Sequence, residues 1–196
     1  MNVKYWLGLG VLLLLQFSLS VSAGQGYQSE YAGQEHRKIK SLSADDINEL
    51  TKGGGWGLAK VAELNGVPGP AHILEMADEI HLTVTQEKEI QKIFNGMKAE
   101  AMELGEKLIQ LEMELNTHFA NRTISQPLLE QSVHEIENVR AKLRIVHLST
   151  HLKTPDILTN EQIVLYNELR GYSKDPCQSI PKGHNAEMWK RHNGCN

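Results

Sequence analysis

The chain has 196 residues, of which 22% are charged, and a formal net charge of −4 at pH 7. An acidic balance argues against nucleic acid and against an anionic membrane surface as partners, because both attract basic proteins. The length suits one domain with a modest hydrophobic core.

Residues 1–23 have the pattern of a cleaved signal peptide. Lys4 provides the positive start, Tyr5 to Leu19 form a mostly apolar run, and Val21-Ser22-Ala23 is a small-residue cleavage site. The run is short for a helix that spans a membrane, so a retained anchor is the less favoured interpretation. We therefore expect an exported protein that begins at about Gly24.

Three short helices are expected in the first part of the chain. Residues 24–41 are rich in Gly, Gln and Ser and then in mixed charges, which predicts a flexible lead-in. Acidic residues after Ser43 predict a helix to about Thr51, which the following glycine run ends. Two more helices are expected over residues 56–65 and, with a proline as its first residue, over residues 70–80.

The strongest helix signal lies between residues 85 and 119. Its apolar and small residues recur in steps of four and three, at Ile90, Phe94, Met97, Ala101, Leu104, Leu108, Leu111 and Leu115. This heptad seam predicts a long helix that packs lengthwise against helical partners. Two interior glycines, Gly96 and Gly105, each weaken helix propensity by about 1 kcal/mol, which indicates a close approach or a bend.

A second long helix and a shorter last helix follow. From a cap at Ser125, apolar residues recur at helical spacing, and this helix is expected to end before Pro155. The last helix is expected over residues 159–171, with Leu158 able to pack on Ile163 as a hydrophobic staple. No stretch of useful length alternates as a β-strand does, so the predicted fold class is all-α.

Two five-residue strings of the form L-T-x-x-Q stand out, Leu82-Thr83-Val84-Thr85-Gln86 and Leu158-Thr159-Asn160-Glu161-Gln162. In each, T-x-x-Q is a capping box: the Thr oxygen accepts from a backbone N–H three residues on, and the Gln reaches back to the Thr N–H. Each string therefore predicts a helix start. One T-x-x-Q is a weak signal, but two of them, each led by Leu, in an exported helical chain are far more specific.

These features resemble the LTxxQ family of bacterial periplasmic proteins, the Spy/CpxP group. The resemblance covers residues 42–172, and stretches such as Gly55-Trp56-Gly57-Leu58-Ala59 and Leu169-Arg170-Gly171-Tyr172 are nearest to the heavy-metal-linked branch of that family. It implies a bent four-helix hairpin bundle with short N-terminal helices, followed by an irregular Cys/His tail over residues 173–196. It also implies a periplasmic location and a homodimer.

The resemblance implies two alternative functions. The first is an ATP-independent, chaperone-like stress-response protein that binds unfolded or stress-damaged envelope proteins and has a link to a divalent metal. The second is a periplasmic heavy-metal sensor or resistance protein that signals to a membrane partner. Flexible methionines on the long helix, Met97, Met102 and Met113, are the candidates for client contact, although Met97 also fits the seam.

Two pairs of side chains are candidates for metal binding. His147 and His151 lie four residues apart on one helix, and His72 and Met76 have the same spacing on an earlier one. Imidazole suits Zn, Ni, Co and Cu, and a thioether favours Cu(I). Because metal-sensing relatives use His and Met from two helices, the resemblance assigns these four residues a ligand role. The alternative is that Met76 is a core residue and that the two histidines flank the seam and face solvent.

The tail holds Cys177, His184, His192 and Cys195, at spacings that depart from those of zinc fingers. Export to an oxidising compartment favours a disulfide between Cys177 and Cys195 over a metal site.

No sequence feature points to catalysis. The chain contains no nucleophile elbow, P-loop, dinucleotide-binding glycine motif or H-E-x-x-H. The acidic residues along the long helix are typical of a solvated face. We therefore expect no enzyme activity and no nucleotide cofactor.

Overall fold

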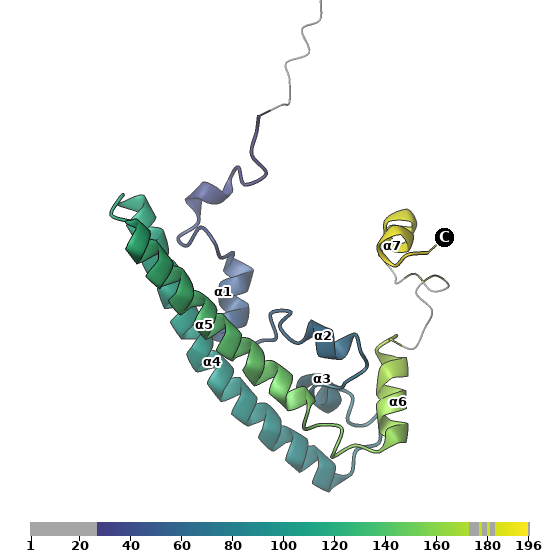
Figure 1. Ribbon diagram of the computed structural model, residues 1–196. Helices are drawn as coiled ribbons and strands as arrows, with labels where there is room; N and C mark the ends of the chain where they lie inside the picture. Colours follow the sequence, from purple (N-terminus) through teal and green to yellow (C-terminus); the bar gives the residue numbers. More distant parts are fainter. Residues whose placement is uncertain (1–26, 173–176, 178–179, 181–182, 196) are drawn as a thin grey trace, which may run out of the picture. The chain divides into compact units, whose positions relative to one another are not determined.

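The computed structural model describes residues 27–172, 177, 180 and 183–195, and all regular structure in these residues is helical (Figure 1). The chain divides into two units, residues 1–35 and residues 36–196. The elements are η1 (Gln34–His36), α1 (Ala44–Thr51), α2 (Lys60–Glu63), α3 (Pro70–Glu75), α4 (Val84–Ala120), α5 (Gln126–His151), α6 (Asn160–Leu169) and α7 (Ala186–His192). The predicted all-α class is thus confirmed for the described residues, whereas the predicted signal peptide lies outside them.

None of the helices in the described part of the chain combines the length and hydropathy needed to cross a membrane.

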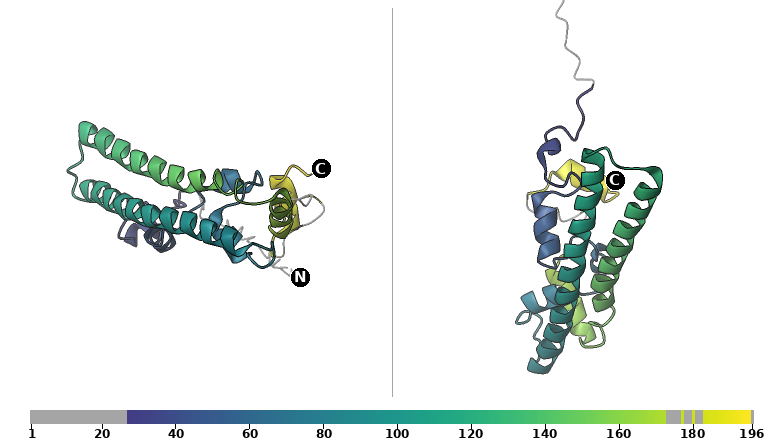
Figure 2. Two further views of the ribbon diagram at one scale, coloured as in Figure 1. Left: turned by 90° about the horizontal axis from the view of Figure 1, so that it is seen from below. Right: turned by 90° about the vertical axis from the view of Figure 1, so that its left-hand side faces the viewer.

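The two long helices, α4 and α5, lie side by side as an antiparallel hairpin (Figure 2). Every position of the predicted seam on α4 is buried or partly buried, at Ile90, Phe94, Met97, Ala101, Leu104, Leu108, Leu111 and Leu115. From α5, Ile136, Leu143 and Val146 complete the first hydrophobic cluster. The heptad period therefore identified the face of α4 that is buried, as the burial of apolar surface requires.

Gly105 allows α1 to approach α4 closely. A β-carbon on Gly105 would collide with the backbone carbonyl oxygen of Leu50, a fully buried residue near the end of α1. A β-carbon on Gly96 would meet nothing within 4 Å. One of the two interior glycines of α4 is thus required for backbone contact, while the other leaves open space beside the helix.

The predicted flexible lead-in, residues 24–41, is wrong at its C-terminal end. Ile39 is only 1% exposed and belongs to the first cluster, together with Leu42. The Ser41 hydroxyl donates to the buried Glu112 carboxylate at 2.7 Å. A single isoleucine among polar residues has no period, so the sequence pattern could not show that this segment packs on the hairpin.

A second hydrophobic cluster joins α3, the start of α4 and α6. Its buried members are Ile73, Ile80, Ile90, Leu158 and Tyr166. The leading leucines of the two L-T-x-x-Q strings, Leu82 and Leu158, both contribute to it, and Ile163 packs against it as the staple predicts. Each string therefore supplies a core side chain as well as a helix cap.

Both capping boxes are formed. Thr83 accepts from the N–H of Gln86 and Thr159 accepts from the N–H of Gln162, each at 3.2 Å. Each glutamine oxygen in turn accepts from the N–H of its own threonine, at 3.0 Å for Thr83 and 2.9 Å for Thr159. These reciprocal bonds satisfy N–H groups that the first turns of α4 and α6 would otherwise leave unpaired.

The two glutamines also bind each other, although they are 76 residues apart in the chain. The Gln86 side-chain amide donates to Gln162 Oε1 at 2.9 Å, and the Gln162 amide donates to Gln86 Oε1 at 3.1 Å. Each amide further donates to the carbonyl before the other string, Gln86 to Ile157 at 2.8 Å and Gln162 to His81 at 3.2 Å. We call this pair, Gln86 and Gln162, the glutamine clasp.

Two short helices differ from their predicted ranges. The helix expected over residues 56–65 is reduced to α2, because Trp56 and Gly57 have positive φ angles of 43° and 70° that a right-handed helix does not contain. The helix expected over residues 70–80 ends at Glu75, and turns lead from there to the first L-T-x-x-Q string.

The tail, expected to be irregular throughout, contains α7. Asn185 caps this helix by accepting from the N–H groups of Glu187 and Met188. Cys177 and Cys195 form a disulfide. The His184 ring lies edge-on to Trp189, with ring centroids 4.9 Å apart. The tail cysteines are therefore bonded to each other and do not offer thiolates to a metal.

Candidate functional site

A pocket of about 650 Å³ lies among the glycine-rich loop at residues 53–57, α2, α3, α4 and α5. Its volume is in the range of small-ligand sites. Glycine backbone and apolar side chains form much of its lining. Three of the four predicted metal ligands, His72, His147 and His151, line this same pocket although they come from two separate helices.

α5 presents His147 and His151 to the pocket from successive turns. Their exposed fractions are 3% and 5%, so the alternative that they face solvent is wrong. The turn around Gly69 covers His151 so closely that a β-carbon on Gly69 would lie 2.5 Å from His151 Cε1. The segments that bury these two histidines are distant in sequence, so helical spacing alone does not reveal the burial.

Two of the histidines have Nδ1 fixed by an oxygen acceptor. His151 Nδ1 lies 2.8 Å from the Val67 carbonyl oxygen, and His72 Nδ1 lies 2.7 Å from a Glu75 carboxylate oxygen. Because a carbonyl or carboxylate oxygen only accepts, Nδ1 carries the proton in both rings. A neutral ring in this tautomer keeps its lone pair on Nε2, which is the arrangement found in metal-ligating histidines.

His147 has a buried nitrogen with no hydrogen-bond partner, namely Nε2. Burial, followed by the nearby charge of His151, lowers the pKa of His147 below its usual value, against a smaller opposing hydrogen-bond effect of the Gly54 backbone. The ring is therefore neutral at pH 7. A buried polar atom without a partner is uncommon in proteins, and in a pocket it is a sign of a ligand site.

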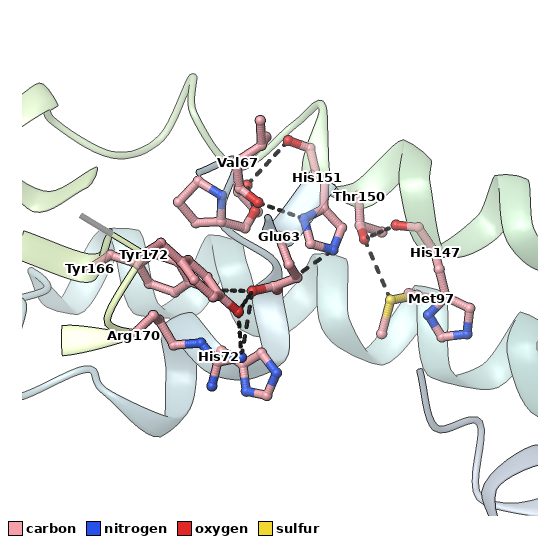
Figure 3. A network of polar contacts seen from close by, with 12 residues as sticks. Glu63, Val67, His72, Met97, His147, Thr150, His151, Tyr166, Arg170 and Tyr172 are labelled. Carbon is pink, nitrogen blue, oxygen red and sulfur yellow. Dashed lines mark hydrogen bonds and ion pairs between the residues drawn. The ribbon is translucent and has the colours of Figure 1, made fainter. Parts of the chain in front are cut away.

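Glu63, at the end of α2, is the centre of a polar network beside His151 (Figure 3). Its Oε2 accepts from the Tyr166 hydroxyl at 2.9 Å and from the Tyr172 hydroxyl at 3.1 Å, and lies 3.6 Å from Arg170 Nη2. Its Oε1 lies 4.0 Å from His151 Nε2. Burial raises the pKa of Tyr166, and the Glu63 charge raises it further, so this phenol remains a donor.

The predicted role of Met76 as a metal ligand is not supported by its position. α3 ends before Met76, and the side chain packs against the second hydrophobic cluster and does not line the pocket. The helical spacing that would set it beside His72 is therefore lost. The alternative that Met76 is a core residue describes it correctly.

The methionines proposed for client contact occupy three different environments. Met97 is 8% exposed in the seam, and Met113 packs partly buried against the first cluster. Only Met102, which is off the seam, is well exposed, at 43%. Met97 and Met113 therefore expose little side chain to a client, although the buried Met97 also lines a groove between α4 and α5.

Among the described residues, no three His, Cys, Asp or Glu side chains are grouped closely enough to hold a metal ion. The pocket does bring together the two imidazoles of α5 and the Met97 thioether of α4. Of the three glutamates that line the pocket, Glu63 and Glu75 already have partners and Glu49 is exposed. The buried donors that remain are nitrogen and sulfur atoms.

The sequence patterns missed four residues of the polar network, namely Glu63, Tyr166, Arg170 and Tyr172. Glu63, Arg170 and Tyr172 lie at helix ends or beside a glycine, and Tyr166 lies within α6, where its aromatic ring suits a core position. The stretch Leu169-Arg170-Gly171-Tyr172 drew notice only as part of the resemblance. Nothing in the chain signals that it meets α2, which lies about a hundred residues earlier.

No family model matches the chain, and comparisons with curated proteins and with solved structures also give no match.

Proposed function

We propose that this protein is an exported, non-catalytic helical protein of the LTxxQ type that binds a transition metal in the pocket formed by α2 to α5. The observation that carries this proposal is the buried Nε2 of His147, which has no hydrogen-bond partner and belongs to a residue that lines the pocket. His151, one turn further along α5, directs its Nδ1–H to a carbonyl and leaves Nε2 for a ligand.

Two further features support the proposal. A metal requires an unprotonated imidazole, and the lowered pKa of His147 keeps that ring unprotonated at neutral pH. The hydrogen bond from His151 Nδ1 to the Val67 carbonyl orients the His151 ring before a metal binds. Imidazole donors suit Zn, Ni, Co or Cu, the metals that the resemblance implies.

The detailed architecture of the helices, the cellular location and the oligomeric state are part of the same proposal. A bent four-helix hairpin of the Spy/CpxP type is supported by the long α4–α5 pair and by the glutamine clasp, which ties the start of α4 to the start of α6. A periplasmic location, a homodimer and the alternative of a metal sensor that signals to a membrane partner rest on the resemblance. N-terminal sequencing of protein from the envelope separates a cleaved, free protein from an anchored sensor.

Calorimetric titration of the purified protein with Zn(II), Ni(II), Co(II) and Cu(II) tests metal binding. We expect micromolar or tighter binding of at least one metal, and a loss of about 10- to 100-fold when His147 and His151 are both replaced by alanine. His134→Ala, an exposed histidine on the same helix, is the matched control and should bind as the original protein does. Equal binding by the double variant and the original protein would place the metal elsewhere.

A chaperone-like role is the second candidate, and a groove of about 690 Å³ between α4 and α5 favours it. Gly96 leaves the groove open, and Ile145 on its wall is 62% exposed. Charged side chains surround this apolar floor, among them Lys92 and Lys153. An exposed apolar surface with a polar rim is typical of a site for other proteins.

An aggregation assay with malate dehydrogenase diluted from urea tests the chaperone role, with and without bound metal. We expect suppression at a near-stoichiometric ratio, and a clear loss for Ile145→Asp. Leu152→Asp changes an even more exposed residue directly after α5, outside the groove, and serves as the control. The absence of protection at about fivefold molar excess would exclude this role.

A further inference from the structure

Among the described residues that line the pocket of His147 and His151, Met97 alone contains sulfur. It comes from α4, opposite the histidines of α5. The Thr150 hydroxyl lies 3.4 Å from the Met97 sulfur and 2.7 Å from the carbonyl oxygen of His147. Met97 is therefore held at the same turn of α5 that carries the unpartnered His147 nitrogen, as the labelled side chains in Figure 3 indicate.

The two glutamates nearest the histidines in the hydrogen-bond network already have partners. The Glu63 carboxylate accepts from two tyrosine hydroxyls and lies 3.6 Å from Arg170. Glu75 is mostly exposed and is paired with His72. The buried donors left for an ion are the Nε2 atoms of His147 and His151 and the Met97 sulfur. An imidazole nitrogen or a thioether that binds a metal is an uncharged ligand.

A buried set of neutral donors favours a monovalent ion. A dication would bring more uncompensated charge into the low-dielectric interior, where isolated charge is costly. Structural zinc sites use four Cys, His or carboxylate ligands, whereas no three such side chains are grouped in the described residues. A thioether is a soft ligand that selects Cu(I), and Cu(I) is stable with only two or three ligands.

We propose that the pocket binds Cu(I) through Met97, His147 and His151, with Met97 in place of the expected Met76. This rests on the proposed function, that the pocket binds a transition metal. His72, half-exposed and paired with Glu75, stays outside the metal ligands.

Competition against a chromophoric Cu(I) chelator tests the proposal, with ascorbate as reductant because it leaves the Cys177–Cys195 disulfide intact. Ag(I), a soft monovalent ion that needs no reductant, is titrated in parallel, and Zn(II) provides the comparison. We expect one Cu(I) or Ag(I) per chain, bound more tightly than Zn(II). Met97→Leu conserves volume and should lower the affinity for both monovalent ions by about tenfold or more.

Met76→Leu is the matched control and should leave the affinity for both monovalent ions unchanged. Circular dichroism and thermal unfolding check that each variant folds, and Met97→Ile is the second variant if leucine is not accommodated. Unchanged Ag(I) affinity in a folded Met97 variant, or tighter binding of Zn(II) than of Cu(I), overturns the assignment of Met97 while metal binding stands. If the original protein binds none of these ions, the proposed function itself fails.

Discussion

Replacing Glu63 with alanine is expected to lower the free energy of unfolding by about 3 kcal/mol. The change removes the acceptor of two tyrosine hydroxyls, one of them on the fully buried Tyr166, and it leaves Arg170 without its carboxylate partner. The Glu63 side chain is only 13% exposed, so water replaces these contacts poorly. Urea unfolding followed by circular dichroism measures the loss.

Two variants make the test of Glu63 specific. Glu63→Gln keeps an oxygen for the tyrosine hydroxyls but removes the charge, so it should cost less than Glu63→Ala. Glu168→Ala, an exposed glutamate of α6, should change the free energy of unfolding by less than about 0.5 kcal/mol. If Glu63→Ala cost no more than Glu168→Ala, the network would be shown to contribute nothing to stability.

Replacing either glutamine of the clasp by alanine is expected to cost about 1–3 kcal/mol. Gln86→Ala removes the bonds of Gln86 to Gln162, to Ile157 and to Thr83, and leaves the Gln162 side chain with unpaired groups. Because the second substitution then removes groups already deprived of partners, the double variant should cost less than the sum of the two. We expect a coupling of about 0.5 kcal/mol or more in a double-mutant cycle.

Gln91→Ala provides the control for the clasp, because Gln91 is an exposed glutamine of α4 that bonds only to Asn95 one turn away. It should change stability by less than about 0.5 kcal/mol. Strict additivity of Gln86→Ala and Gln162→Ala would contradict the clasp. It would leave two independent helix caps, each with the contribution expected for a cap alone.

The glutamine clasp joins helices that carry residues of both the pocket and the groove. It ties the start of α4 to the start of α6, and α6 supplies Tyr166 to the Glu63 network beside His151. The same α4 then carries Met97 to the pocket and Gly96 to the groove on the hairpin. We therefore expect that the contact between the starts of α4 and α6 contributes to the stability of the protein and also to ligand binding in the pocket.

Local features of the chain were predictable from sequence because they depend on neighbours within a few residues. The heptad steps from Ile90 to Leu115 identified the buried face of α4, since each helical turn repeats the same direction. The two L-T-x-x-Q strings identified the caps at Thr83 and Thr159, since a capping box is closed within four residues. The all-α class followed from the same periodicity.

The contacts between distant segments depended on the tertiary structure. Helical spacing paired His147 with His151 correctly but also paired His72 with Met76, and only the early end of α3 separated that second pair. The hydrogen bond of Ser41 to Glu112, the clasp between Gln86 and Gln162 and the network at Glu63 all join residues 70 or more positions apart. No local pattern encodes such contacts, because they arise only when packing of the apolar faces brings the polar groups between them together. The sequence by itself determined the helices and their caps, and the packing of those helices decided which side chains share a pocket.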